Sequence, residues 1–101
     1  MEILHTLAAR LDGASETMTT VSRTVTAADP AQAAFGADAP GRPGEIGRAL
    51  HRQWAAATGD RAREAHAAAA RLAAAAAAVR EAADRYAGAD HAARRRLTGE
   101  R

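Results

Sequence analysis

The sequence predicts an all-α protein: an antiparallel two-helix hairpin with a long second helix, assembling into a four-helix bundle. Thirty-two of its 101 residues are alanine, the strongest helix former. Leu, Ile, Val and Phe together number only 12, too few to build the core of a β-sandwich, a barrel or an α/β enzyme. Apolar residues recur at helical spacing on both sides of one Pro- and Gly-rich segment. We therefore expect a single domain over residues 1–101.

The first helix is expected over residues 2–28. Its apolar positions alternate in steps of three and four, the pattern of a helix that packs on another helix. This predicted stripe consists of Leu4, Leu7, Leu11, Ala14, Met18, Val21, Val25 and Ala28. The many Ser and Thr residues between them are mediocre helix formers, so packing must stabilise the helix. A strand over residues 19–26 is disfavoured because the apolar residues there do not alternate with period two.

A loop is expected over residues 29–44. Asp29-Pro30 ends the first helix, because the residue before a proline avoids the α region. The segment contains all three prolines, and a short helical turn is expected near residues 31–35. Phe35, its only bulky apolar residue, is expected to fold back on the helix ends.

The second helix is expected over residues 45–97, followed by a frayed tail at 98–101. Its stripe moves in steps of four and then in alternating steps of four and three: Ile46, Leu50, Trp54, Thr58, Ala62, Ala65, Ala69, Leu72, Ala76, Val79, Ala83 and Tyr86. Gly59 inside it predicts a bend or a close helix approach. The first helix would cover only about half of this length at ~1.5 Å per residue. Because the seam is mostly alanine, a second copy or another hairpin is expected to complete a four-helix bundle.

The composition argues against several functional classes. The net charge is only +2 and the acids alternate with the arginines, so no single-sign surface for nucleic acid is expected. No signal peptide or bilayer-spanning stretch is visible, and there is no cysteine. The histidines lack metal-ligand spacing, and no catalytic set can be assembled. We expect no enzyme activity, cofactor, metal site or membrane insertion, and we interpret Arg94–Arg96 as part of a solvated tail.

Two features suggest contact with other proteins. Trp54 lies on the apolar stripe, where it either plugs the loop end of the bundle or anchors a partner. Tyr86 and Asp90 form a Tyr-x-x-x-Asp pair, and four-residue spacing places both side chains on one helix face.

This layout resembles the helical-hairpin substrates of actinobacterial type VII (ESX) secretion. It is most similar to the EspC-like secretion targets, which are related to the Trp-x-Gly hairpin substrates. The resemblance covers about residues 3 to 92 and rests on the heptad helix near Met1 and on three segments. These are Ala33-Ala34-Phe35-Gly36, Trp54-Ala55-Ala56-Ala57, and Ala82-Ala83-Asp84-Arg85-Tyr86-Ala87-Gly88-Ala89-Asp90. Trp-x-Gly hairpins place their motif in the turn, whereas Trp54 lies inside the predicted helix.

The resemblance implies that Tyr86 and Asp90 form a C-terminal export signal that is offered to a secretion ATPase. It implies secretion through the type VII pathway from the cytoplasm, without a cleavable signal peptide. The chain would be a substrate, or the helical escort of a secreted effector. Its partner would be itself, another helical hairpin or an effector's N-terminal helical domain. The expected partner interface comprises Leu4, Leu7, Leu11, Met18, Val21, Val25, Trp54, Leu72 and Val79. The alternative is a non-secreted cytoplasmic adaptor or oligomerisation module, in which Tyr86 is a core residue.

Overall fold

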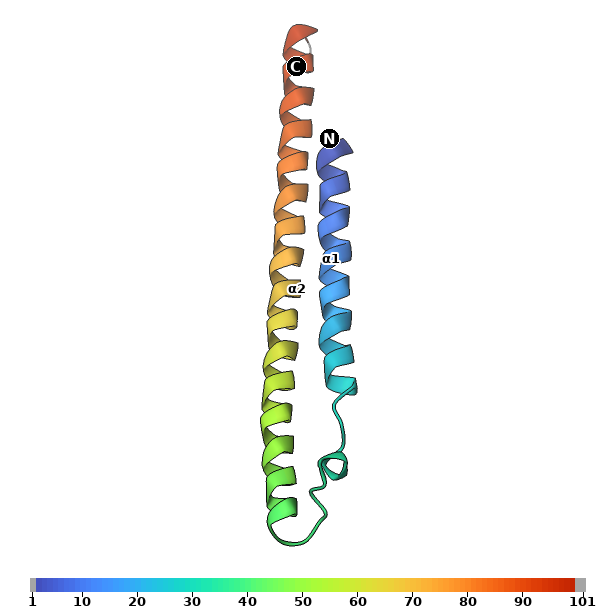
Figure 1. Cartoon of the computed structure of the whole chain (residues 1–101). Helices are drawn as coiled ribbons and strands as arrows, with labels where there is room; N and C mark the ends of the chain where they lie inside the picture. Colours follow the sequence, from blue (N-terminus) through green and yellow to red (C-terminus); the bar gives the residue numbers. More distant parts are fainter. Residues whose placement is uncertain (1, 100–101) are drawn as a thin grey trace. The chain divides into compact units, whose positions relative to one another are not determined.

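Residues 2–99 are described in a computed structural model of the chain, and they contain two α-helices and one 3₁₀ helix (Figure 1). The elements are α1 (Glu2–Ala27), the 3₁₀ helix η1 (Gln32–Phe35) and α2 (Gly41–Leu97). No strand occurs among these residues. The prediction of an all-helical hairpin is confirmed. The first helix ends one residue before the expected Ala28, and the second begins four residues before the expected Glu45.

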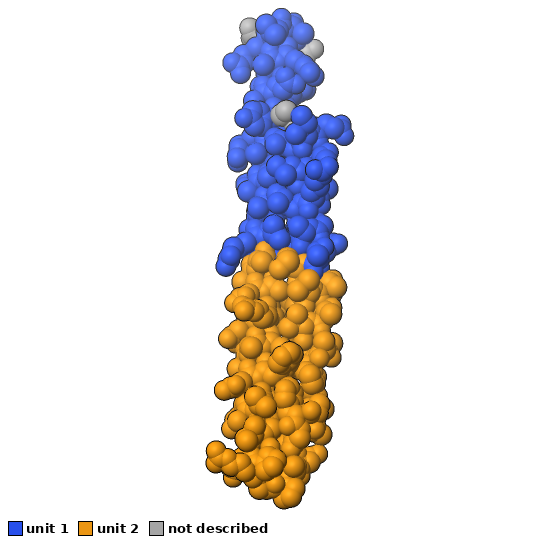
Figure 2. Space-filling view, in the orientation of Figure 1, with its two compact units in different colours: residues 1–17, 69–101 blue, residues 18–68 orange. Residues whose placement is uncertain are grey.

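The chain divides into two compact units (Figure 2). Unit 1 consists of residues 1–17 and 69–101, and unit 2 consists of residues 18–68. Each unit pairs a piece of α1 with an antiparallel piece of α2. Unit 2 also contains the connection between the helices and η1.

In both units α1 contacts α2 through small residues. In unit 1 the Ser15 hydroxyl donates to the Ala69 carbonyl at 2.8 Å, and Ala8 and Ala76 are fully buried. In unit 2 the Ser22 hydroxyl donates to the Ala62 carbonyl at 3.0 Å. In each bond the two residue numbers add up to 84, so residue i of α1 lies opposite residue 84 − i of α2. The numbers of Ala8 and Ala76 also add up to 84. We call this set of positions the small-residue seam, and its side chains let two helix backbones approach closely.

The seam turns α1 away from the orientation predicted from its larger apolar residues. Leu4, Leu11, Met18 and Val25 of the expected stripe are half-buried, but four other members are exposed: Leu7 (44%), Ala14, Val21 (40%) and Ala28. Ala8, Ser15 and Ser22 lie against α2 in place of Leu7, Ala14 and Val21. The two sets repeat equally every seven residues, so spacing alone does not separate them. The structure favours the small set because a serine hydroxyl can donate to a carbonyl across a close helix contact.

The predicted stripe of α2 is correct for its middle and wrong for its beginning. From Ala62 to Ala83 every predicted position is buried or half-buried. Ile46, Leu50 and Trp54, by contrast, remain about half exposed. Gly44 and Gly47 are buried instead, because the connection lays its backbone against that side of the helix.

The connection is held against the first turns of α2 by close backbone contacts. A Cβ built on Gly44 would lie 1.8 Å from the Ala39 carbonyl oxygen, and one on Gly47 would lie 2.3 Å from that of Phe35. The Arg48 guanidinium also donates to the Ala37 carbonyl at 2.8 Å. This part of the chain was expected to be loop up to residue 44. Helix is possible there because a proline in a first turn lacks only an N–H that has no intrahelical partner.

The rest of the connection agrees with expectation. η1 is the short helical turn that was predicted, and it ends at Gly36 with a φ of 75°. Phe35 is half-buried and its ring contacts those of His51 and Trp54, at centroid distances of 5.7 and 6.3 Å. Gly59, which was expected to mark a bend or close helix approach, would meet only the Arg63 guanidinium. The glycines that permit close approach are Gly44 and Gly47.

Replacing Gly47 with alanine should destabilise the protein, because the new methyl group collides with backbone of the connection. We expect a loss of about 1–3 kcal/mol in the free energy of unfolding, measured by urea denaturation with circular dichroism. Gly13→Ala is the control, since its Cβ meets nothing within 4 Å. It should be neutral, or stabilising by up to ~1 kcal/mol. Equal effects of the two variants would contradict the close approach at Gly47.

A larger side chain at Ala76 should force the helices apart. Ala76→Leu is expected to cost about 1–3 kcal/mol of unfolding free energy, because the seam has no room for the added atoms. Ala77 is exposed on the same helix, so Ala77→Leu should change stability by less than ~0.5 kcal/mol. A seam that accepted leucine as readily as the exposed position would not be closely packed.

Candidate functional site

The end of α2 extends past the beginning of α1 within unit 1 (Figure 1). By the register of the seam, Glu2 lies opposite Ala82, and the neighbouring Ala83 is the last buried residue of α2. Residues 84–91 are all exposed. We call residues 84–97 the overhang, because no part of α1 lies opposite them.

Tyr86 and Asp90 lie on this overhang. Tyr86 is 62% exposed, and the Asp90 carboxylate forms an ion pair with Arg94 at 3.0 Å. Together with Ala87 and His91, these residues line a shallow surface hollow. The hollow presents an aromatic ring next to a carboxylate and a guanidinium on one helical face. Such a surface suits recognition by another protein, since aromatic and arginine side chains dominate binding energy at interfaces.

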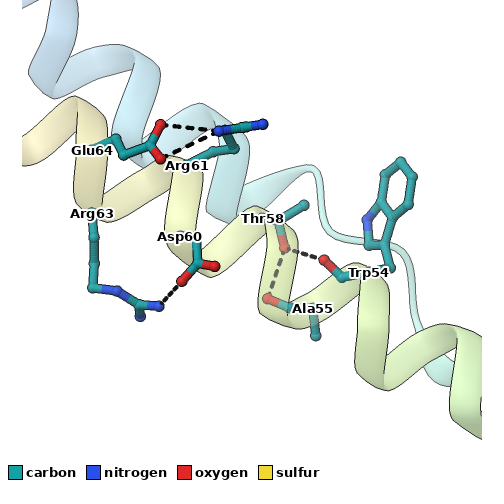
Figure 3. Close-up of polar contacts among 7 residues, drawn as sticks. All are labelled: Trp54, Ala55, Thr58, Asp60, Arg61, Arg63 and Glu64. Atoms are coloured by element: carbon teal, nitrogen blue, oxygen red, sulfur yellow. Dashed lines mark hydrogen bonds and ion pairs between the residues drawn. The ribbon is translucent and has the colours of Figure 1, made fainter.

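Trp54 does not plug the loop end of a core. Its side chain projects from α2 in unit 2 (Figure 3), and the residue is 49% exposed. The Phe35 ring covers only part of it. One turn later, the Thr58 hydroxyl lies 3.0 Å from the Trp54 carbonyl and 3.3 Å from an Asp29 carboxylate oxygen. The covered stripe therefore passes through Thr58, and Trp54 lies at its side with Ile46 and Leu50.

The residues expected at a partner interface fall into two groups. Leu7, Val21 and Trp54 are exposed and available to a partner. The others are half-buried beside the seam of the same chain: Leu4, Leu11, Met18, Val25, Leu72 and Val79. Only the first group offers a surface that the hairpin itself leaves open.

Ser15 and Ser22 were predicted only to be mediocre helix formers, and their part in the helix contact was not predicted. Both donate hydrogen bonds to the facing helix. A visible signal was the seven-residue repeat of small side chains, at 8, 15 and 22 in α1 and at 62, 69, 76 and 83 in α2. The contact between Asp12 and Arg80, which joins the helices in unit 1, was also not predicted.

Two further ion pairs are local and lie on the surface. In unit 2, Arg61 pairs with Glu64 at 3.1 Å and Arg63 pairs with Asp60 (Figure 3). Exposed pairs of this kind contribute only about 0–1 kcal/mol each. Over residues 2–99, no three His, Asp or Glu side chains gather where they could hold a metal ion. In the same range, neither helix contains a stretch long and apolar enough to cross a bilayer.

No family model, curated protein or solved structure matches this chain. Two features of the described surface are candidate contacts for another protein: the aromatic and charged face of the overhang, and the exposed apolar residues beside the seam.

Truncating Tyr86 should leave the hairpin intact. Because the side chain is mostly exposed, Tyr86→Ala should change the free energy of unfolding by less than ~0.5 kcal/mol. Leu72→Ala is the comparison, since Leu72 is half-buried beside the seam and should cost ~1 kcal/mol or more. Urea unfolding of both variants at a single protein concentration provides the measurement. A loss at Tyr86 as large as that at Leu72 would show that Tyr86 is a core residue.

Proposed function

We propose that this chain is a type VII (ESX) secretion substrate, or the helical escort of a secreted effector, with Tyr86 and Asp90 as its export signal. The observation that carries the proposal is the exposure of this pair on the overhang. A secretion ATPase could bind the pair there while the hairpin remains folded. The resemblance of the Ala82–Asp90 segment to the EspC-like secretion targets supports the same assignment.

We further propose that the hairpin associates into a four-helix bundle before export. The chain exposes 7430 Å², whereas a compact protein of 10.4 kDa is expected to expose about 5,400 Å². The excess of about 2,000 Å² exceeds the roughly 800 Å² that each partner buries in a standard stable interface. Among residues 2–99 no large side chain is fully buried, so covering the excess would also supply apolar burial that the single hairpin lacks.

The exposed residues beside the seam are the natural contacts for such an assembly. Leu7 belongs to unit 1, and Val21 and Trp54 belong to unit 2. Tryptophan contributes strongly at interfaces because it buries a large area. The partner is a second copy, another helical hairpin or the helical domain of an effector.

Export measurements test the proposed signal. The tagged chain would be expressed in an actinobacterium with a working type VII system, and its amounts in culture filtrate and cells compared. We expect Tyr86→Ala and Asp90→Asn to remain in the cells, because the ATPase loses the ring or the carboxylate that it reads. Deleting the secretion ATPase should retain the unmodified chain in the same way.

Two variants on the same overhang serve as matched controls. Leu97→Ala removes another exposed apolar side chain, and Asp84→Asn removes another exposed carboxylate. Both should be exported normally. Normal export of Tyr86→Ala would overturn the signal assignment. If the unmodified chain also stayed in the cells, the alternative of a cytoplasmic helical adaptor would be favoured.

A further inference from the structure

The small-residue seam is compatible with more than one alignment of the two helices. In unit 1, α1 contributes small residues at positions 8 and 15, and α2 contributes alanine at 69, 76 and 83. Each series repeats every seven residues. Sliding α1 by seven residues, about 10.5 Å along the axis, again places small residues opposite small residues.

A slide toward the end of α2 preserves the polar contact of the seam in unit 1. Residue i of α1 would then lie opposite residue 91 − i of α2. Ala8 would face Ala83 in place of Ala76, and the Ser15 hydroxyl would face the Ala76 carbonyl in place of that of Ala69. The carbonyl of any helical residue is an equivalent acceptor, so the hydrogen bond is retained.

The same slide improves the apolar contacts beside the seam. Leu4 and Leu11 are half-buried, as are Val79 and Leu72, which lie one residue from the positions opposite them. After the slide, Leu11 would lie opposite Arg80, next to Val79, and Leu4 would lie opposite Ala87, next to Tyr86. The exposed aromatic ring would thus be covered, and removing its apolar surface from water favours the second register.

The contacts that oppose the slide lie largely outside the seam. In unit 1 the slide retains the Asp12–Arg80 pair, because Asp12 would lie opposite Val79, the neighbour of Arg80. In unit 2 the connection is held by Arg48 on the Ala37 carbonyl and by its approach to Gly44 and Gly47. Unwinding η1 and the following turn would supply the added length, because extended backbone spans about 3.3 Å per residue.

We propose that the hairpin has a second register, one heptad along, in which the start of α1 covers Tyr86. In the observed register Tyr86 is exposed. The contacts of the connection with α2 favour this register over the second one. The consequence for export, that the second register hides the signal, rests on the function proposed above. The existence of the register does not.

Engineered disulfides test this directly, because the chain has no cysteine of its own. The pair Ala8→Cys with Ala76→Cys reports the observed register, and Ala8→Cys with Ala83→Cys reports the second. In the observed register, positions 8 and 83 are offset by about 10 Å along the axis, beyond the ~7 Å Cα separation that a disulfide allows. The control is Ala8→Cys with Ala69→Cys, which has the same offset in the opposite direction but would leave more of α2 uncovered.

Each purified variant would be oxidised at low concentration, and intrachain disulfides quantified on non-reducing gels. We expect the 8–76 pair to close fastest, the 8–83 pair to close more slowly but completely, and the 8–69 pair to remain open. Failure of the 8–83 pair, or equal closure of the 8–83 and 8–69 pairs, would overturn the second register. Neither result would affect the export test of Tyr86→Ala.

The only tyrosine supplies the second readout. Nitration of Tyr86 by tetranitromethane should be several-fold slower in the oxidised 8–83 variant than in the unmodified chain, which has no thiol for the reagent to oxidise. The oxidised 8–76 variant should be nitrated as fast as the unmodified chain. Equal nitration rates in the oxidised 8–83 variant and the unmodified chain would show that α1 does not cover the ring, and that part of the proposal would be wrong.

Discussion

The close contact of α1 with α2 along small residues is the constraint on which the other features of this hairpin depend. Two serine hydroxyls reach the backbone of the facing helix at 2.8 and 3.0 Å. Helices that approach this closely leave no room between them for large side chains. Leu4, Leu11 and Met18 are therefore half-buried at the edges of the contact. The six buried apolar residues in the described part of the chain are all alanines.

The close contact also determines which side chains remain exposed on the surface. Because the edges of the contact are open, the hairpin presents apolar side chains along them, among them Leu7 and Val21. The register, in turn, sets where α1 begins along α2. With Glu2 opposite Ala82, the remaining turns of α2 are uncovered, and Tyr86 lies on the first of them. The proposed export signal and the proposed assembly surface thus follow from one structural cause.

Much of this could be predicted from the sequence. Alanine content and spacing were sufficient for the two helices, Asp29-Pro30 located the end of the first, and the difference in helix length predicted an uncovered stretch of α2. The orientation of α1 could not be predicted, because Leu7 and Ala8 repeat with the same period and hydrophobicity favours the leucine. What reverses that preference is a contact between distant segments: a serine hydroxyl gains a carbonyl partner only when both helices are in place. The close approach of the connection to Gly44 and Gly47 could not be predicted for a related reason. The positions of glycines in a sequence do not show which backbone segment will pack against them.

The orientation of α1 is the central claim, and methyl nuclear Overhauser effects measure it most directly. In a uniformly labelled sample, the Ala8 methyl group should show a strong cross-peak to the Ala76 methyl group, because both are fully buried in one contact. The Leu7 methyl groups should show none to any methyl group of α2 in the monomeric protein. Cross-peaks from Leu7 to α2, with none between Ala8 and Ala76, would mean that the larger apolar residues face the second helix and that the small-residue seam does not exist.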